Sequence, residues 1–150
     1  MDRKYIFWRI IIAVIGFYHI VAGLVLLFSG ELALKLVHSF AGMTLTGSPE
    51  LGIIGEIFGC YLLAFGLMMG IAAWDPIKKR DLLTVGLILF FLRIFQRLFF
   101  AQKVMTVFHI PSYKYWTAFV LIAFLGLLVG FFRWIIYRDT YNAPSNTQSG

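Results

Sequence analysis

The chain has 150 residues, of which 61% are hydrophobic and 18% aromatic, and its mean hydropathy is +0.87. A chain this short cannot bury so much apolar surface in a core of its own, so the composition excludes a water-soluble globular protein. The net charge is +6, but the basic residues flank the apolar runs and form no basic stripe, which excludes a nucleic-acid-binding surface.

Four apolar runs are each close to the roughly 20 residues that a membrane-spanning helix needs. They cover residues 5–29, 50–73, 82–101 and 113–137. We therefore predict an all-α polytopic membrane protein, in which residues 1–138 form a bundle of four transmembrane helices. Residues 139–150 are polar and are predicted to form a disordered tail.

The connections between the runs differ in character. In residues 30–40, polar Glu31, Lys35 and His38 recur at helical spacing, which predicts a short amphipathic helix in the membrane interface between the first two spans. Residues 74–81 are predicted to form a tight turn between the second and third spans. Residues 102–112 are predicted to form a second interfacial connection, in which Pro111 ends any helix.

The basic residues outside the apolar runs predict the orientation of the chain in the membrane. If the N-terminus is cytoplasmic, most of them lie on the cytoplasmic side: Arg3, Lys4, Arg9, Lys78, Lys79, Arg80, Arg133 and Arg138. Lys35, Lys103 and Lys114 then lie outside. Because cytoplasmic loops carry the excess of Lys and Arg, this distribution predicts that both termini are cytoplasmic.

Several polar side chains lie within the predicted spans, where a charge costs several kcal/mol unless it is paired or hydrated. At about 1.5 Å per residue, Glu56 lies about 8–9 Å below the outer end of its span, Arg97 about 6 Å and Arg93 about 12 Å. His19 lies about 15 Å from the outer end of the first span, close to the midplane. Gln96 accompanies the two arginines.

Two interpretations of this cluster follow from its position. Glu56 shares a broad helical stripe with several glycines, a pattern that predicts close helix packing, so we expect it to pair with Arg93 or Arg97 inside a compact bundle. Since Glu56 neutralises only one arginine, the other would reach lipid phosphates or hold an anionic ligand such as a lipid head group or a carboxylate. The candidate ligand-binding residues are therefore Arg93, Arg97, Glu56 and Gln96.

His19 has two interpretations as well. It is a hydrogen-bonded core histidine, or it is the single ligand of a haem or a chlorophyll-type pigment. A two-histidine haem site is excluded, because His38 and His109 both lie in interfacial segments. Cys60 is the only cysteine, which excludes an intrachain disulfide, and it is expected to be a small core residue.

The sequence contains no recognisable catalytic motif and no cluster with metal-ligand spacing. We therefore expect neither an enzyme nor a metal site, and no cofactor apart from a bound lipid or the pigment at His19.

The stretch PELGIIGEIFGCYLLAFGLMMGIAAWDPIKKRDLLTVGLILFFLRIFQRLFF resembles the DoxX-like family of small four-helix membrane proteins of unknown function. Members have a glycine-rich second helix with a polar residue near its outer start, a short basic turn, and a third helix that ends in an arginine. The resemblance assigns Glu56, Gly59 and Gly66 to the second-helix motif and Arg97, with Arg93, to the third. It implies a four-helix fold in the bacterial cytoplasmic membrane and implies no reaction.

Two main functional hypotheses remain. The first is a non-enzymatic accessory subunit of a larger membrane complex, because the chain has short loops and no aqueous domain. Its partners would be other integral membrane subunits or further copies of itself, besides membrane lipids. The second is a protein that binds or transports a small amphipathic anion or lipid through Arg93 and Arg97.

Overall fold

The computed structural model describes residues 5–41 and 49–141, and within these ranges it is all-helical, without a strand. The helices are α1 (Ile6–Phe28), α2 (Gly30–Ala41), α3 (Pro49–Trp74), α4 (Arg80–Phe99), α5 (Ala101–Val107) and α6 (Ser112–Tyr141). Four of them, α1, α3 from Gly52 onward, α4 and α6, are long and apolar enough to cross a membrane. The four predicted spans are thus confirmed as apolar helices of spanning length.

The ends of the helices differ from the prediction in two places. Helix α6 continues to Tyr141, so the first residues assigned to the polar tail, from Asp139, are helical, and residues 142–150 lie outside the described ranges. The second connection contains a helix, α5, that the sequence did not indicate. Pro111 does not end it: α5 stops before His109, which has a φ of 50°, and the Pro111 carbonyl accepts a hydrogen bond from the Tyr115 N–H in the first turn of α6.

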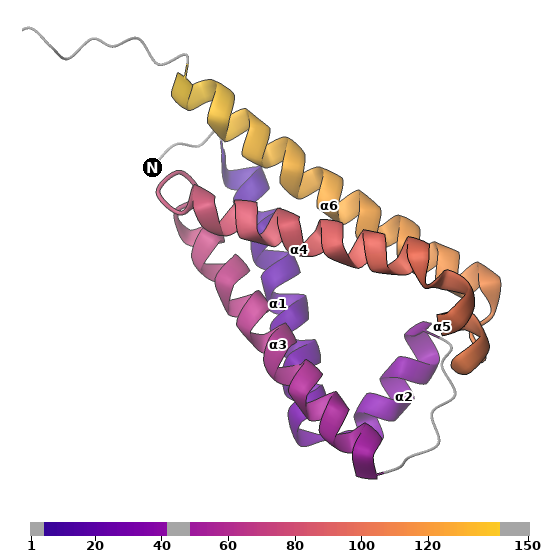
Figure 1. The fold of residues 1–150 in the computed structure, drawn as a ribbon. Coiled ribbons are helices and arrows are strands. Elements are labelled where there is room, and N and C mark those ends of the chain that lie inside the picture. Colours follow the sequence, from indigo (N-terminus) through magenta and orange to yellow (C-terminus); the bar gives the residue numbers. More distant parts are fainter. Residues whose placement is uncertain (1–4, 42–48, 142–150) are drawn as a thin grey trace, which may run out of the picture.

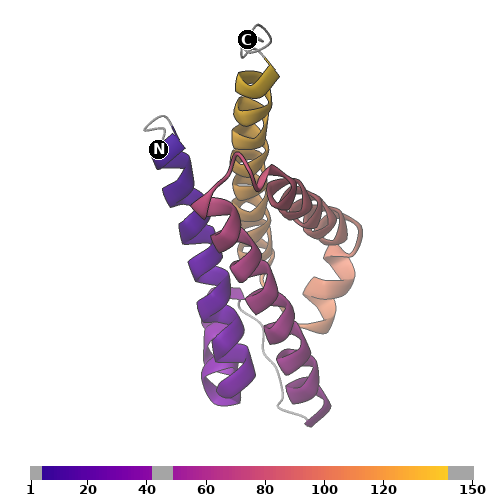
Figure 2. The ribbon, with the colours of Figure 1, turned by 90° about the vertical axis from the view of Figure 1, so that its left-hand side faces the viewer.

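The four long helices are arranged as two pairs, α1 with α3 and α4 with α6 (Figure 1). The pairs meet at the end of the molecule that holds the start of α1, the turn at residues 75–79 and the end of α6, which we call the closed end. There the Tyr5 hydroxyl donates a hydrogen bond of 2.8 Å to Asp139. The pairs diverge toward the opposite, open end, where α2 contacts α6, and Figure 2 shows the same divergence from the side. The compact bundle that the sequence suggested is not what the structure shows.

Helices α1 and α3 pack backbone against backbone at two reciprocal pairs of glycines. A Cβ atom on Gly16 would lie 2.9 Å from the Gly66 carbonyl oxygen, and one on Gly66 would lie 2.7 Å from the Gly16 oxygen. Gly23 and Gly59 form the second pair, at 2.8 and 2.9 Å. The pairs are two turns apart on antiparallel helices, so any larger side chain there would force the two backbones apart.

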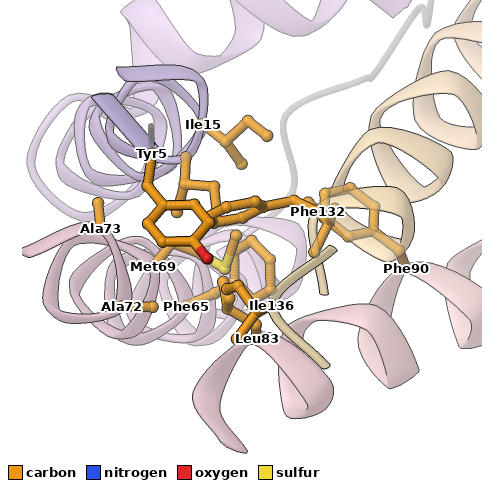
Figure 3. Packing of buried hydrophobic residues seen from close by; sticks show 12 residues of the cluster. Tyr5, Ile15, Phe65, Met69, Ala72, Ala73, Leu83, Phe90, Phe132 and Ile136 are labelled. Atoms are coloured by element: carbon orange, nitrogen blue, oxygen red, sulfur yellow. The ribbon is translucent and has the colours of Figure 1, made fainter. Parts of the chain in front are cut away.

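Side chains of all four long helices pack together in the apolar core (Figure 3), whose members lie toward the closed end. Its members come from the half of each long helix that is nearest this end: Tyr5, Ile12 and Ile15, then Phe65, Met69, Ala72 and Ala73, then Leu83 and Phe90, and finally Val129, Phe132 and Ile136. The Trp8 ring stacks on Phe132, with ring centroids 5.4 Å apart. The closed end is therefore where the two pairs of helices are joined.

The glycine contacts of α4 differ from those between α1 and α3, because they pass through large side chains. A Cβ on Gly126 of α6 would lie 3.3 Å from that of Phe90, and one on Gly130 would lie 3.4 Å from Leu87. Gly86 of α4 faces the Met69 sulfur of α3. At these glycines α4 therefore meets its neighbours through side chains, whereas α1 and α3 meet backbone to backbone.

The glycine contacts lead to a stability prediction. Gly66→Ala should lower the free energy of unfolding by about 1–3 kcal/mol, the usual effect of overpacking, since the opposing atoms belong to a rigid backbone. Gly55→Ala in the same helix is the control, because a Cβ there has no atom within 4 Å. Thermal unfolding in detergent measures both variants. Equal stability of the two variants would contradict the close α1–α3 contact.

Candidate functional site: an arginine pair inside the membrane span

His19 is a buried polar residue of α1 and has 3% of its surface exposed. Its Nδ1 lies 2.7 Å from the Ile15 carbonyl oxygen, and its Nε2 lies 3.3 Å from the Arg93 Nη1. A carbonyl oxygen only accepts and a guanidinium only donates, so Nδ1 carries the proton and Nε2 accepts. These two neighbours together select the neutral imidazole with the proton on Nδ1.

Arg93 joins the two pairs of helices through this hydrogen bond. His19 belongs to α1 and Arg93 to α4, and the histidine ring packs on Phe65 of α3 with centroids 4.7 Å apart. Phe65 in turn meets Phe90, one turn before Arg93, edge to face at 5.7 Å. The His19–Arg93 contact therefore lies at the edge of the apolar core, on the side where the pairs begin to diverge.

Arg97 is held by a different residue, Tyr115 of α6. The Arg97 guanidinium carbon lies 5.1 Å from the centre of the Tyr115 ring, a cation–π contact. The Tyr115 hydroxyl donates a hydrogen bond of 2.7 Å to the Arg97 backbone carbonyl. Because Tyr115 is buried, this contact fastens the last turn of α4 to the start of α6.

Neither arginine is neutralised by a carboxylate of the described residues. The ion pairs within these ranges join Lys78 to Asp75 and Arg138 to Asp139, both at the closed end. Arg93 contacts a neutral histidine, and Arg97 contacts an aromatic ring. Two half-buried positive charges thus stand one turn apart in an apolar helix.

Glu56 does not pair with Arg93 or Arg97, so that prediction is wrong in this structure. Its side chain is exposed on α3 and forms no ion pair with the described residues. At about 100° per residue, Glu56 lies about 60° from Gly59 and about 80° from Gly66 around the helix axis. The broad glycine stripe was too coarse a guide, because Gly59, Gly66 and Gly70 lie against α1, whereas Cβ atoms on Gly52 and Gly55, which flank Glu56 in the sequence, would meet no atom within 4 Å.

One further expectation needs correction. Cys60 is exposed and is not a core residue. The apolar run showed that Cys60 lies in a span and gave no indication of which side of the helix faces a neighbour. Gln96 is exposed on α4 next to Arg97, and its role as a ligand-binding residue stays a prediction.

Tyr115 was missed as a functional residue. The sequence contains an indication that would have found it, since Tyr115 begins a seven-residue repeat that continues with Ile122, Val129 and Ile136. Such a repeat keeps its members on one side of a helix. Tyr115, Val129 and Ile136 are all buried.

The contact of the His19 Nε2 atom affects the pigment hypothesis. A haem or chlorophyll-type pigment would bind through the Nε2 of His19, and the Arg93 guanidinium lies against that nitrogen. Ligation would require Arg93 to move away. Within the described ranges no three His, Cys, Asp or Glu side chains come together as a group that could hold a metal ion.

These four apolar helices define an integral membrane protein of small size. No family model, no curated protein and no solved structure matches the chain. The resemblance to the DoxX-like family therefore stays a prediction.

The His19–Arg93 contact predicts a measurable coupling. In a double-mutant cycle, His19→Phe and Arg93→Leu should show a coupling free energy of about 0.5–1.5 kcal/mol, the range of hydrogen bonds within membranes, because each single change leaves the other group without its partner. Unfolding in detergent is the measurement. The matched cycle of Glu56→Gln with Arg93→Leu should show no coupling. Coupling in the Glu56–Arg93 cycle, without coupling in the His19–Arg93 cycle, would show that Glu56 and not His19 is the partner of Arg93.

Proposed function

We propose that this integral membrane protein binds a small amphipathic anion at Arg93 and Arg97, through a carboxylate or phosphate group. The observation that carries the proposal is that both guanidinium groups lie in an apolar helix, and neither pairs with a carboxylate of the described residues. An uncompensated charge in a membrane span is unfavourable by several kcal/mol. A bound anion would remove that penalty.

The contacts of the two arginines support an anion in particular. Arg93 uses one terminal nitrogen on His19, and Arg97 presents a ring-stacked guanidinium, so further N–H donors remain on both. Planar guanidinium groups bind carboxylate and phosphate oxygens in pairs of hydrogen bonds. His19 and Tyr115 would act as positioning residues, since they hold the arginines from the side of the protein.

The surroundings of the pair favour a ligand that also has an apolar part. Leu92, Phe95 and Phe99 of α4 are about half exposed or more, and they flank the arginines. In a bilayer these side chains face hydrocarbon. An anion that carried an alkyl chain would therefore gain apolar contacts next to its charged group.

The proposal includes an orientation. We place the closed end at the cytoplasmic side, because Arg9, Lys78, Lys79 and Arg80 lie there among the described residues. The arginine pair then lies toward the outer leaflet. Helix α2 would lie in the outer interface as an amphipathic helix, with Ala33 buried and Lys35 exposed. The membrane would be the bacterial cytoplasmic membrane, as the family resemblance implies.

An accessory subunit of a membrane complex is the second candidate. Phe91, Phe95 and Phe99 recur every fourth residue on the exposed surface of α4, and the Phe95 and Phe99 rings lie 4.1 Å apart. Such an aromatic ridge suits packing against a helix of another subunit. It is equally compatible with lipid, so we rank this candidate below anion binding.

Retention of the anion is the direct test. Native mass spectrometry of the purified protein should show a bound acidic lipid or fatty acid, and Arg93→Gln or Arg97→Gln should reduce its retention about tenfold, the equivalent of one charge-assisted hydrogen bond. Lys103→Gln, which removes an exposed charge from α5, is the matched control and should retain the ligand. Loss of the fold in both arginine variants, with no ligand on the wild type, would favour the accessory subunit.

The orientation is tested by labelling of single cysteines in a Cys60→Ala background. Lys79→Cys should react only from the cytoplasmic side, and Lys114→Cys only from the outer side, because an apolar helix separates the closed end from the start of α6. Impermeant thiol reagents applied to intact cells and to inverted vesicles give the measurement. Reaction of both positions from one side would contradict the model of four spans.

A further inference from the structure

The closed end carries a second feature, independent of the arginine pair. A cavity of about 680 Å³ lies between the first turn of α1 and the turn that follows α3, and Arg9, Trp74, Asp75 and Lys78 are among its lining residues. Two apolar grooves of about 380 Å³ each adjoin it. The cavity shares Arg9 and Trp74 with the first groove, and Trp74 and Asp75 with the second.

We propose that this end binds an anionic phospholipid from the adjacent leaflet, with the phosphate in the cavity and one acyl chain in each groove. The cavity carries the charged side chains Arg9, Asp75 and Lys78 and shares lining residues with the two apolar grooves, an arrangement that matches a charged head group with two chains. Gly70 lies in the lining of both grooves, and a Cβ there would meet no atom within 4 Å, so the space beside it is open.

Arg9 is the principal phosphate-binding residue of the proposal. Its Nε donates a hydrogen bond of 2.8 Å to the Ala73 carbonyl in the last turn of α3. This contact satisfies a carbonyl that the helix leaves unpaired, and it fixes the guanidinium at the cavity wall. The terminal nitrogens of Arg9 make no hydrogen bond or ion pair with the described residues, so they are available to phosphate oxygens.

Lys78 supplies a second positive charge to the cavity, and the nearby Asp75 does not neutralise that charge. Asp75 accepts a hydrogen bond from the Lys78 backbone N–H at 3.2 Å, which orders the turn, and its other oxygen lies 3.7 Å from the Lys78 Nζ. The Lys78 side chain is 82% exposed. Exposed ion pairs of this kind contribute little, so Lys78 is able to turn toward a phosphate. Lys79, which lines the second groove, and the exposed Arg80 follow Lys78 in the chain and add positive charge to this end.

Trp74 places the cavity at the level of the lipid head groups. It is the last residue of α3, is 82% exposed, and lines the cavity and both grooves. Tryptophan collects at the interface because its ring is apolar while its N–H is polar. Basic pockets at this depth are suited to acidic head groups.

Binding of defined lipids to the full chain tests the proposal by native mass spectrometry in detergent. Dioleoyl phosphatidylglycerol should be retained several-fold better than dioleoyl phosphatidylcholine, and better than single-chain lysophosphatidylglycerol. Arg9→Gln should reduce its retention about tenfold, as expected for a charge-assisted hydrogen bond. Lys78→Gln, in an exposed turn, should weaken retention without affecting the fold. Gly70→Leu should also reduce retention, because it fills both grooves.

Two controls separate this site from others. Arg138→Gln removes a charge from the same end but outside the cavity, so the preference for phosphatidylglycerol should persist. The variants are compared in an Arg93→Gln/Arg97→Gln background, which removes lipid held at the arginine pair and should leave the preference of this cavity for phosphatidylglycerol, since the proposal does not rest on that pair. Equal losses for Arg9→Gln and Arg138→Gln, absence of the preference in that background, or inorganic phosphate that competes as well as the lipid would each overturn the proposal. No effect of Gly70→Leu would overturn it as well.

Discussion

The backbone contact between α1 and α3 is the constraint on which the rest of the structure depends. In a bilayer, two helices gain little from burying apolar side chains, because lipid tails are equally apolar. Close van der Waals contact is what remains, and the Gly16–Gly66 and Gly23–Gly59 pairs provide it. This contact makes α1 and α3 one unit, against which α4 and α6 pack only near the closed end.

The packing of α1 against α3 sets the position of the polar groups within the spans. His19 lies one turn from both Gly16 and Gly23, at the flank of the contact, where it reaches past α3 toward α4. The Ile15 carbonyl and Arg93 then fix its tautomer, and Arg93 is held where the two pairs of helices separate. Arg97 is fixed independently by Tyr115 of α6. Each arginine is thus positioned by a different pair of helices.

The two ends of the molecule carry positive charge in different physical settings. Toward the open end, Arg93 and Arg97 lie within an apolar span, where a charge without a counter-ion is strongly unfavourable. At the closed end, Arg9 and Lys78 lie next to a turn and an exposed tryptophan, so in the proposed placement water and lipid head groups would reach them. Anion binding at the first site would compensate a buried charge, whereas binding at the second would use charges that are already hydrated.

The sequence by itself determined the four spanning helices, the turn at residues 75–79 and the list of polar residues inside the membrane. These features follow from runs of apolar residues and from single polar residues within them, which are local properties of the chain. The sequence also indicated that glycines take part in close helix packing, but it did not show which of them touch a neighbouring helix.

Only the tertiary structure decided which side of each helix meets which neighbour. Glu56 was the expected partner of Arg93, but an angular offset of about 60° from Gly59 on α3 left it exposed, and the buried His19 of α1 contacts Arg93 instead. Hydrophobic periodicity could not resolve this offset, because a membrane helix is apolar on the lipid side and on the protein side alike. The glycine contacts, in which a Cβ would lie 2.7–2.9 Å from an opposing carbonyl oxygen, fixed which sides of α1 and α3 meet.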